Sequence, residues 1–185
     1  MVVIHFINVN MPIDSSINFV SINIAVITIS DSRTLTNDTS GDLLEKRIIE
    51  AGHHMVKRTI IPDDVSHIKK TLQIMSKEKE IDCIITTGGT GLTGRDTTPE
   101  AVKKIANKQI DGFGELFRQI SYEKIGTSAI QSRAIAALIN RTYVFCLPGS
   151  TNACKDGWDE ILKYQLDIRH KPCNFVEIMP RLNEK

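Results

Sequence analysis

Residues 84–100 constrain the fold of this chain more than any other stretch. The run from Ile81 to Thr87 is largely apolar and β-branched, which predicts a buried strand. Thr98 is predicted to cap a helix, with Pro99 at its first position and Glu100 in its first turn. Between strand and helix, four glycines fall within seven residues, namely Gly88, Gly89, Gly91 and Gly94. The stretch is therefore predicted to form a strand, a glycine loop and a helix.

The glycine loop has the chemistry of an anion site. Glycine allows the backbone to approach a ligand closely, and such a loop presents several N–H groups beside a helix start. Four glycines followed by Arg95 and Asp96 exceed what a tight connection requires. The pattern favours a phosphate or carboxylate ligand over a plain turn.

Two nucleotide-binding motifs match this loop only in part. Gly89, Gly91 and Gly94 spell G-x-G-x-x-G, but the dinucleotide fingerprint also needs an acidic residue about 20 positions later, at the end of a strand. Asp111 has that spacing without following an evident strand. An NAD-dependent oxidoreductase is therefore a remote alternative. The P-loop pattern lacks its lysine and hydroxyl, because Arg95 and Asp96 occupy those positions.

The composition is that of a soluble globular protein and excludes several classes. The chain has 185 residues, a net charge of +1 and 5% aromatic residues, which argue against nucleic acid as a partner. No segment is apolar for long enough to predict a membrane helix. The four cysteines have no C-x-x-C spacing, so we expect reduced thiols and a cytoplasmic location. Residues 1–18 are predicted to form an N-terminal tail or oligomer arm, with Met1 or Met11 as the start, and residues 19–185 a single domain.

Strands and helices are predicted to alternate along the chain, which is typical of an α/β, three-layer α/β/α sandwich around a mostly parallel sheet. Turn residues set the limits of each element. The adjacent histidines His53 and His54 are expected to be a surface pair. The predicted strands are Ile22–Ile29, Val56–Ile61, Ile81–Thr87 and Tyr143–Leu147. The predicted helices are Gly41–Ala51 (capped by Thr39 or Ser40), Val65–Lys79, Pro99–Asn107, one beginning at Gly112–Glu115, Thr127–Leu138 and Asn152–Leu166.

Polar or small residues follow each predicted strand, and parallel strands would bring them to one edge of the sheet. Carboxylates there suit Mg²⁺, and glycine amides suit phosphate oxygens, so the mixture favours phosphoryl or nucleotidyl transfer. Asp63 or Asp64 before the next helix is a common cap, and for either residue taken alone the pattern favours capping over catalysis. The four groups are Ser30-Asp31-Ser32, Asp63-Asp64, the glycine loop with Asp96, and Pro148-Gly149-Ser150.

Five short blocks in order carry a resemblance to a known family, and they are Thr87–Gly91, Arg95–Glu100, Gly112–Glu115, Ser132-Arg133 and Leu147–Ser150. Together they resemble the MoaB/MogA family of molybdenum cofactor biosynthesis proteins. The resemblance runs from Ile22 to Phe175, and the residues 149–154 and 171–175 resemble the MoaB branch.

The resemblance implies a function. Active members of the family adenylylate molybdopterin with Mg-ATP and release pyrophosphate. Their two catalytic aspartates map onto Asp63 and Asp96, which would hold Mg²⁺ or orient the attacking phosphate. The residues that would line the same cleft and bind nucleotide or pterin are Ser30, Asp31, Gly88, Gly89, Thr90, Gly91, Gly149 and Ser150.

The family also implies a homo-oligomer, either a trimer or a hexamer. A second hypothesis is a MoaB-like protein that binds molybdopterin without catalysis. The presence of both aspartates favours the catalytic interpretation.

Overall fold

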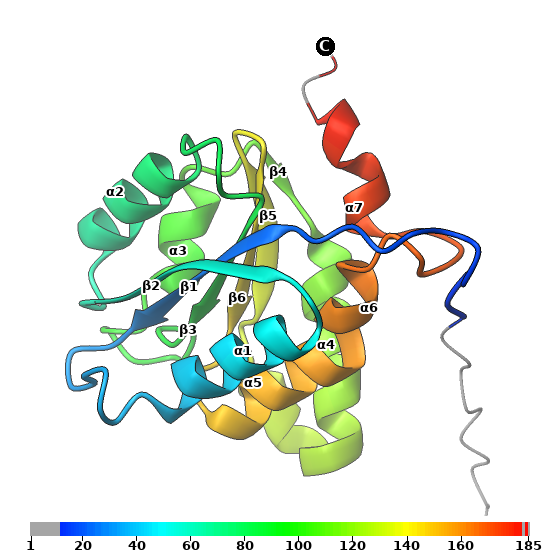
Figure 1. The fold of residues 1–185 in the computed structure, drawn as a ribbon. Coiled ribbons are helices and arrows are strands. Elements are labelled where there is room, and N and C mark those ends of the chain that lie inside the picture. The colour runs from blue at the N-terminus through cyan, green and yellow to red at the C-terminus, as the bar shows by residue number, and fades with distance from the viewer. Residues whose placement is uncertain (1–11, 183, 185) are drawn as a thin grey trace, which may run out of the picture.

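The structure is a computed structural model that describes residues 12–182 and residue 184. Strands and helices alternate through most of the chain (Figure 1). The strands are β1 (Asn23–Ile29), β2 (His54–Ile61), β3 (Cys83–Thr87), β4 (Lys108–Gln109), β5 (Ile135–Ile139) and β6 (Thr142–Leu147). The helices are α1 (Thr39–Glu50), α2 (Val65–Met75), α3 (Thr98–Lys103), α4 (Asp111–Ile125), α5 (Thr151–Gly157), α6 (Lys163–Gln165) and α7 (Phe175–Ile178), with η1 (Gly126–Gln131), η2 (Trp158–Leu162) and η3 (Met179–Arg181).

The strands form one six-stranded sheet in the order β2-β1-β3-β6-β5-β4. The first four of these run parallel, whereas β5 is antiparallel to both β6 and β4. Strands β3 and β6 are buried along their whole length because helices cover both faces of the sheet. The predicted α/β fold around a mostly parallel sheet is confirmed.

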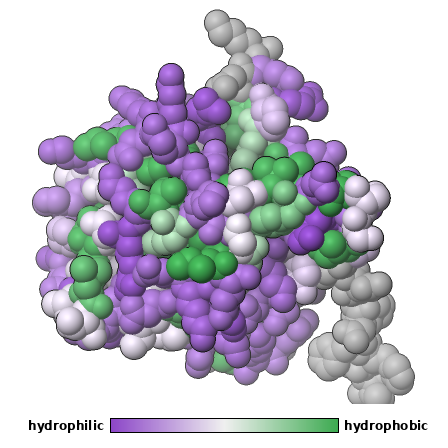
Figure 2. Space-filling view, in the orientation of Figure 1, coloured by the Kyte–Doolittle hydropathy of each residue, from purple (hydrophilic) through white to green (hydrophobic). Residues whose placement is uncertain are grey.

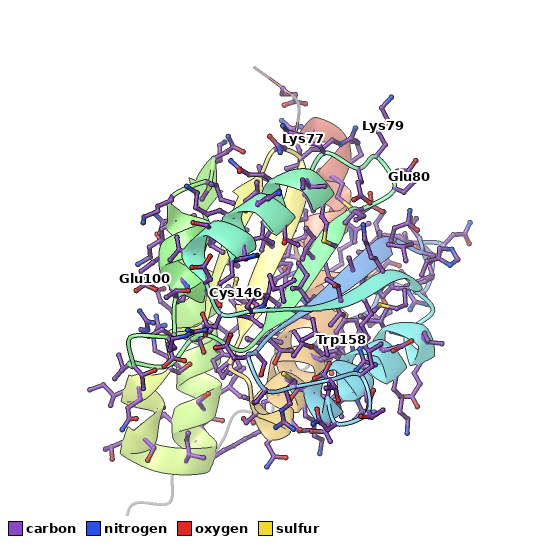
Figure 3. All side chains as sticks on the ribbon, turned by 90° about the vertical axis from the view of Figure 1, so that its left-hand side faces the viewer. Lys77, Lys79, Glu80, Glu100, Cys146 and Trp158 are labelled. Carbon is purple, nitrogen blue, oxygen red and sulfur yellow. The ribbon has the colours of Figure 1, made fainter. Side chains whose placement is uncertain are left out.

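Two apolar cores, one on each face of the sheet, hold the layers together. Side chains of alternate β1 residues enter opposite cores, as with Val26 and Ile27. Helices α1, α4 and α5 contribute to the first core and α2 and α3 to the second, in agreement with their positions in Figure 1. Trp158 lies in the larger core and Cys146 within the sheet (Figure 3).

One predicted helix is wrong. Residues 127–138 form the 3₁₀ helix η1 and then β5, which pairs with β6 from Ile135 to Ile139. The alanine-rich stretch favours a helix locally, but pairing with a neighbouring strand and burial in the sheet outweigh that preference. Asn140, at φ 57°, makes the tight turn between the two strands, and this turn signal was missed.

The helix caps differ from the predicted ones at two of three sites. Asp38, not Thr39 or Ser40, caps α1 by accepting a hydrogen bond from the Gly41 N–H at 3.0 Å. Thr98 is inside α3 instead of capping it. Its hydroxyl donates to the Gly88 carbonyl at 3.0 Å, so a tertiary contact takes the side chain away from the helix start.

The cap of α2 settles one alternative that the sequence left open. Asp64 accepts hydrogen bonds from the amides of Ser66 and His67. Its neighbour Asp63 is therefore not the cap of α2. The predicted helices at 65–79 and 99–107 end earlier, at Met75 and Lys103, and the predicted helix 152–166 is divided by a π-helical turn at Trp158–Leu162.

His53 is buried, contrary to the predicted surface pair. Its ring packs against Phe19 and the edge of Trp158, and its Nδ1 accepts the Ile22 N–H at 3.3 Å. Desolvation lowers the pKa of His53 from 6.5 to about 4, against an opposing effect of Asp167. His54, the next residue, is exposed.

This burial predicts a loss of stability in acid. Between pH 6.5 and about 4 the unfolded chain gains a proton at His53 that the folded chain does not bind. The free energy of unfolding should therefore fall by up to about 1.4 kcal/mol per pH unit in that window. Urea unfolding from pH 7 to 4 measures it. His53→Asn should flatten the dependence and His54→Asn should not; an equal slope in His53→Asn and the wild type would contradict the prediction.

The cysteines are free thiols in two environments. Cys83, Cys146 and Cys154 are buried, and Cys173 is exposed. Burial raises the pKa of Cys146 to about 12 and that of Cys154 to about 11, which suppresses the reactive thiolate.

We expect a thiol reagent to label native protein at Cys173 alone within minutes. All four cysteines should react once the chain is unfolded in denaturant. Mass spectrometry of the labelled peptides measures this, and Cys173→Ser should abolish the fast phase. Fast native labelling at Cys154 would show that the structure opens beside β6.

The described start of the chain lies along the segment that precedes α7. Asp14 donates its N–H to the Arg169 carbonyl at 2.8 Å, and Lys171 donates to the Pro12 carbonyl at 3.1 Å. The prediction for residues 1–18 falls mostly on residues 1–11, which lie outside the described part, so the 18/19 boundary stays a prediction. On the face in Figure 2, hydrophobic residues occur in small groups among hydrophilic ones. None of the helices in the described part is long and apolar enough to cross a membrane.

Candidate functional site

The carboxyl ends of β1, β2, β3 and β6 surround a cavity of about 570 Å³. This is where open parallel sheets place their ligand sites. Every site residue predicted from the sequence lines the cavity, and these are Ser30, Asp31, Asp63, Gly88, Gly89, Thr90, Gly91, Asp96, Gly149 and Ser150. The turn with Lys77, Lys79 and Glu80 lies at the opposite end of the sheet (Figure 3).

Close packing requires glycine at the first two positions of the loop. Gly88 has φ 103°, and a Cβ there would lie 2.2 Å from the Ile29 carbonyl oxygen. Gly89 has φ 64°, and a Cβ there would lie 2.3 Å from the Thr98 hydroxyl and 2.8 Å from Asp63 Oδ2. Because neither residue has a side chain, the loop packs directly against the carboxyl end of β1 and the first residue of α3.

The loop amides are not equivalent. The Gly88 N–H already donates to the Leu147 carbonyl at 3.1 Å, so this residue shapes the loop and has no amide to offer. The amides of Gly89 and Thr90 make no hydrogen bond to any residue of the described ranges 12–182 and 184. Both residues line the cavity, so their N–H groups are the donors that remain for an anion.

The G-x-G-x-x-G spacing does not have the geometry of a dinucleotide fingerprint. The third glycine of that motif permits close packing of helix on strand. A Cβ at Gly94 would meet nothing within 4 Å, and α3 begins only at Thr98. The structure therefore gives no support to the NAD alternative.

Asp63 is a buried carboxylate that faces the cavity. Thr97 donates both its N–H, at 3.1 Å, and its hydroxyl, at 2.9 Å, to Asp63 Oδ1. Oδ2 lies so close to Gly89 that a Cβ there would be 2.8 Å away, and it accepts no hydrogen bond from the described residues. One oxygen thus fixes the side chain and the other remains available to a ligand.

Asp96 is held by its own loop. Thr93 donates its N–H to Asp96 Oδ2 at 2.9 Å and its hydroxyl to the same oxygen at 2.6 Å. The bond from the Thr93 hydroxyl, followed by those from the amides of Thr93 and Gly91, keeps the pKa of Asp96 below its usual value against the effect of partial burial. The carboxylate is therefore charged at neutral pH.

Asp31 joins the glycine loop to the ends of two strands. Its Oδ1 accepts the Asp63 N–H at 3.3 Å, and its Oδ2 pairs with Arg95 at 2.5 Å. Ser30 and Ser150 fix local turns, since the Ser30 hydroxyl accepts the amides of Ser32 and Arg33 and Ser150 caps α5.

Sequence reasoning missed one wall of the cavity. The wall comes from α4 and η1, and much of it belongs to the stretch that was predicted as a helix. The Gly112–Glu115 and Ser132-Arg133 blocks were the only signals for this region. The residues concerned are Phe117, Ser121, Ile125, Ser128, Gln131 and Ser132.

The cavity is acidic, although its loop suits an anion. Asp31, Asp63 and Asp96 line it, and no lysine or arginine is among its described lining residues. A phosphate-bearing ligand would therefore need a counter-charge from a cation. The described residues contain no group of three or more His, Cys, Asp or Glu that would hold a metal ion by themselves. Mg²⁺ fits this donor set, because it commonly uses one or two carboxylates, water and the substrate's phosphates.

The fold and the cavity define an α/β protein whose parallel strands end at an acidic, amide-lined cleft. A family model described as "Probable molybdopterin binding domain" matches residues 25–168. The chain belongs to this family of molybdenum cofactor biosynthesis proteins, as its five sequence blocks predicted.

Relatives and solved structures agree with this assignment. The chain is 42% identical over 160 residues to molybdenum cofactor biosynthesis protein B of Escherichia coli (strain K12), covering 86% of this chain and 94% of the relative. A crystal structure of molybdenum cofactor biosynthesis protein B superposes with a TM-score of 0.80 at 38% identity, covering 89% of this chain and 98% of the other. The tungsten cofactor synthesizing protein MoaB from Pyrococcus furiosus gives 0.65 at 37% identity, with coverages of 77% and 91%.

Proposed function

We propose that this chain acts in molybdenum cofactor biosynthesis as a molybdopterin adenylyltransferase, with Mg-ATP and molybdopterin as substrates. The observation that carries the proposal is the meeting of Asp63, Asp96 and the free amides of Gly89 and Thr90 in one cavity. Membership of a molybdopterin-binding family supports the pterin substrate.

The proposed step transfers an adenylyl group. An oxygen of the terminal phosphate of molybdopterin forms a bond to the α-phosphorus of ATP. The bond between that phosphorus and the oxygen bridging to the β-phosphorus breaks, and pyrophosphate leaves. The products are adenylyl-molybdopterin and pyrophosphate, so no oxidant or reductant is required.

The residues of the chain bind and orient the reactants. The amides of Gly89 and Thr90 would donate to phosphate oxygens. Ser30, Asp31, Gly149 and Ser150 complete the cleft. Fixed donors of this kind contribute by orientation and by charge stabilisation, since they need no rearrangement during the reaction.

Asp63 and Asp96 would hold the magnesium ion. When bound, Mg²⁺ neutralises phosphate charge and stabilises the leaving pyrophosphate. The free Oδ2 of Asp63 supports this role, because its other oxygen is already occupied by Thr97. Either aspartate would alternatively orient the attacking phosphate.

The test is an adenylylation assay with purified protein, molybdopterin, Mg²⁺ and ATP, in which adenylyl-pterin and pyrophosphate are both measured. Formation of both products, lost in Asp96→Asn, is the expected result. Binding of molybdopterin without product would instead support the non-catalytic alternative. Equal turnover of Asp96→Asn and the wild type would remove Asp96 from the proposed mechanism.

Self-association is a separate part of the proposal. A trimer or hexamer of this chain would extend the family resemblance, and a cytoplasmic location fits the free thiols. Light scattering of the purified protein distinguishes a trimer or hexamer from a monomer.

A further inference from the structure

Arg133 does not line the cavity, yet it donates hydrogen bonds to three carbonyl groups of the glycine loop. It follows η1 and precedes β5, far from the loop in sequence. Its Nε donates to the carbonyls of Gly91 at 2.8 Å and Thr90 at 3.3 Å, and its Nη2 donates to the Asp96 carbonyl at 2.6 Å. Its Nη1 pairs with Glu100 in the first turn of α3.

A carbonyl held by Arg133 fixes the direction of an amide. In a planar trans peptide the C=O and N–H groups point in opposite directions. The peptide that joins Asp96 to Thr97 has its carbonyl on Arg133 and its N–H on Asp63 Oδ1, at 3.1 Å. A single peptide unit thus connects the guanidinium group to the Asp63 carboxylate.

A second peptide unit connects Arg133 to the neighbourhood of Asp96. The carbonyl of Thr90 accepts from Arg133 Nε, and the same peptide continues into Gly91, which packs against the Asp96 carboxylate: a Cβ on Gly91 would lie 2.6 Å from Asp96 Oδ2. Asp63 thus receives an amide whose own carbonyl is bound by Arg133, and Asp96 lies against a second peptide unit that Arg133 binds.

We propose that Arg133 is a positioning residue that sets the orientation of both the Asp63 and the Asp96 carboxylates through these two peptide units. Only a guanidinium group has the fork of donors that reaches three carbonyls and a carboxylate together; a lysine ammonium would reach fewer of them. The carboxylate of Glu100 pairs with Nη1 of the guanidinium group and so helps to fix its position. The consequence for catalysis rests on the function proposed above.

Hydrogen exchange tests the positioning without any assay of activity. Arg133→Lys and Arg133→Ala should raise the exchange rates of the Gly91 and Thr97 amides by about fivefold or more, because both amides lose their fixed orientation. Glu100→Gln should act in the same direction with a smaller effect. The amides of β1 and β3 should keep their wild-type rates, which shows that the fold is intact.

Arg118 provides the matched control. It lines the same surface pocket as Arg133 but makes only one hydrogen bond in the described part of the chain, to the Ala134 carbonyl at 3.4 Å. Arg118→Ala removes an equal charge and should leave exchange of the Gly91 and Thr97 amides unchanged.

Kinetics supply the second readout. Arg133→Ala should lower kcat on the order of 100-fold with little change in the KM for ATP, as expected when reacting groups are misoriented. Millimolar guanidinium chloride should raise the kcat of Arg133→Ala about tenfold, because the free guanidinium ion fills the vacated space. It should not raise the kcat of Asp96→Asn.

The two readouts separate the two proposals. Faster exchange in Arg133→Lys, in a protein whose wild type forms no adenylyl-pterin, would support the positioning role and overturn the proposed enzyme activity. Unchanged exchange of the Gly91 and Thr97 amides in both Arg133 variants would overturn the positioning role, whatever the activity.

Discussion

Replacing Asp63 with asparagine is expected to lower the proposed adenylyl transfer by about 10²- to 10³-fold, the usual cost of removing one group that stabilises transition-state charge. Asparagine keeps an oxygen that accepts the Thr97 N–H and hydroxyl, so the loop should hold its position. The negative charge of this cavity-lining side chain is lost. Initial rates of pyrophosphate release at saturating ATP and Mg²⁺ measure the effect.

The neighbouring residue offers a control of the same chemistry. Asp64 caps α2 outside the cavity, and asparagine is as good a cap as aspartate. Asp64→Asn should therefore keep both the activity and the stability of the wild type. If Asp63→Asn and Asp64→Asn lost activity equally, the assignment of the cavity carboxylate would be wrong.

Gly88→Ala is expected to destabilise the fold by roughly 3 kcal/mol, from steric overlap together with the strain of a left-handed backbone. The added Cβ would lie 2.2 Å from the Ile29 carbonyl oxygen, at the end of the interior strand β1. Neither group is a flexible side chain that would move aside. Urea unfolding followed by circular dichroism measures the change.

Gly94 is the control for this substitution. It belongs to the same loop, but a Cβ there would meet nothing within 4 Å. Gly94→Ala should therefore change the free energy of unfolding by less than about 0.5 kcal/mol, as is usual for surface positions. A large loss of stability in Gly94→Ala would show that the loop is packed differently.

Many residues of the candidate site could be predicted from the sequence, because short-range sequence patterns determine where the loops leave the strands. A buried strand followed by glycines, Thr98 and Pro99 predicts where a loop leaves the sheet. Parallel strands then bring all such loops to one edge, so the predicted residues meet in one cavity. Their chemical roles remain predictions until activity is measured.

Local rules failed where distant residues compete for the same groups. The stretch 135–139 has the composition of a helix, yet β6 provides hydrogen-bond partners for it as a strand. Thr98 has the character of a cap, but the Gly88 carbonyl lies within reach of its hydroxyl. His53 follows the turn at Ala51-Gly52, and only the packing of Phe19 and Trp158 buries it.

The sequence by itself determined the α/β class, the family and the residues at the strand ends, because each depends on short-range patterns of apolar, glycine and acidic residues. Only the tertiary structure decided which aspartate caps a helix and which faces the cavity, which loop amides remain free, and how Arg133 reaches the glycine loop. The physical reason is that a hydrogen-bonding group can satisfy only a few partners. Which partners come within reach depends on how elements far apart in the chain are packed.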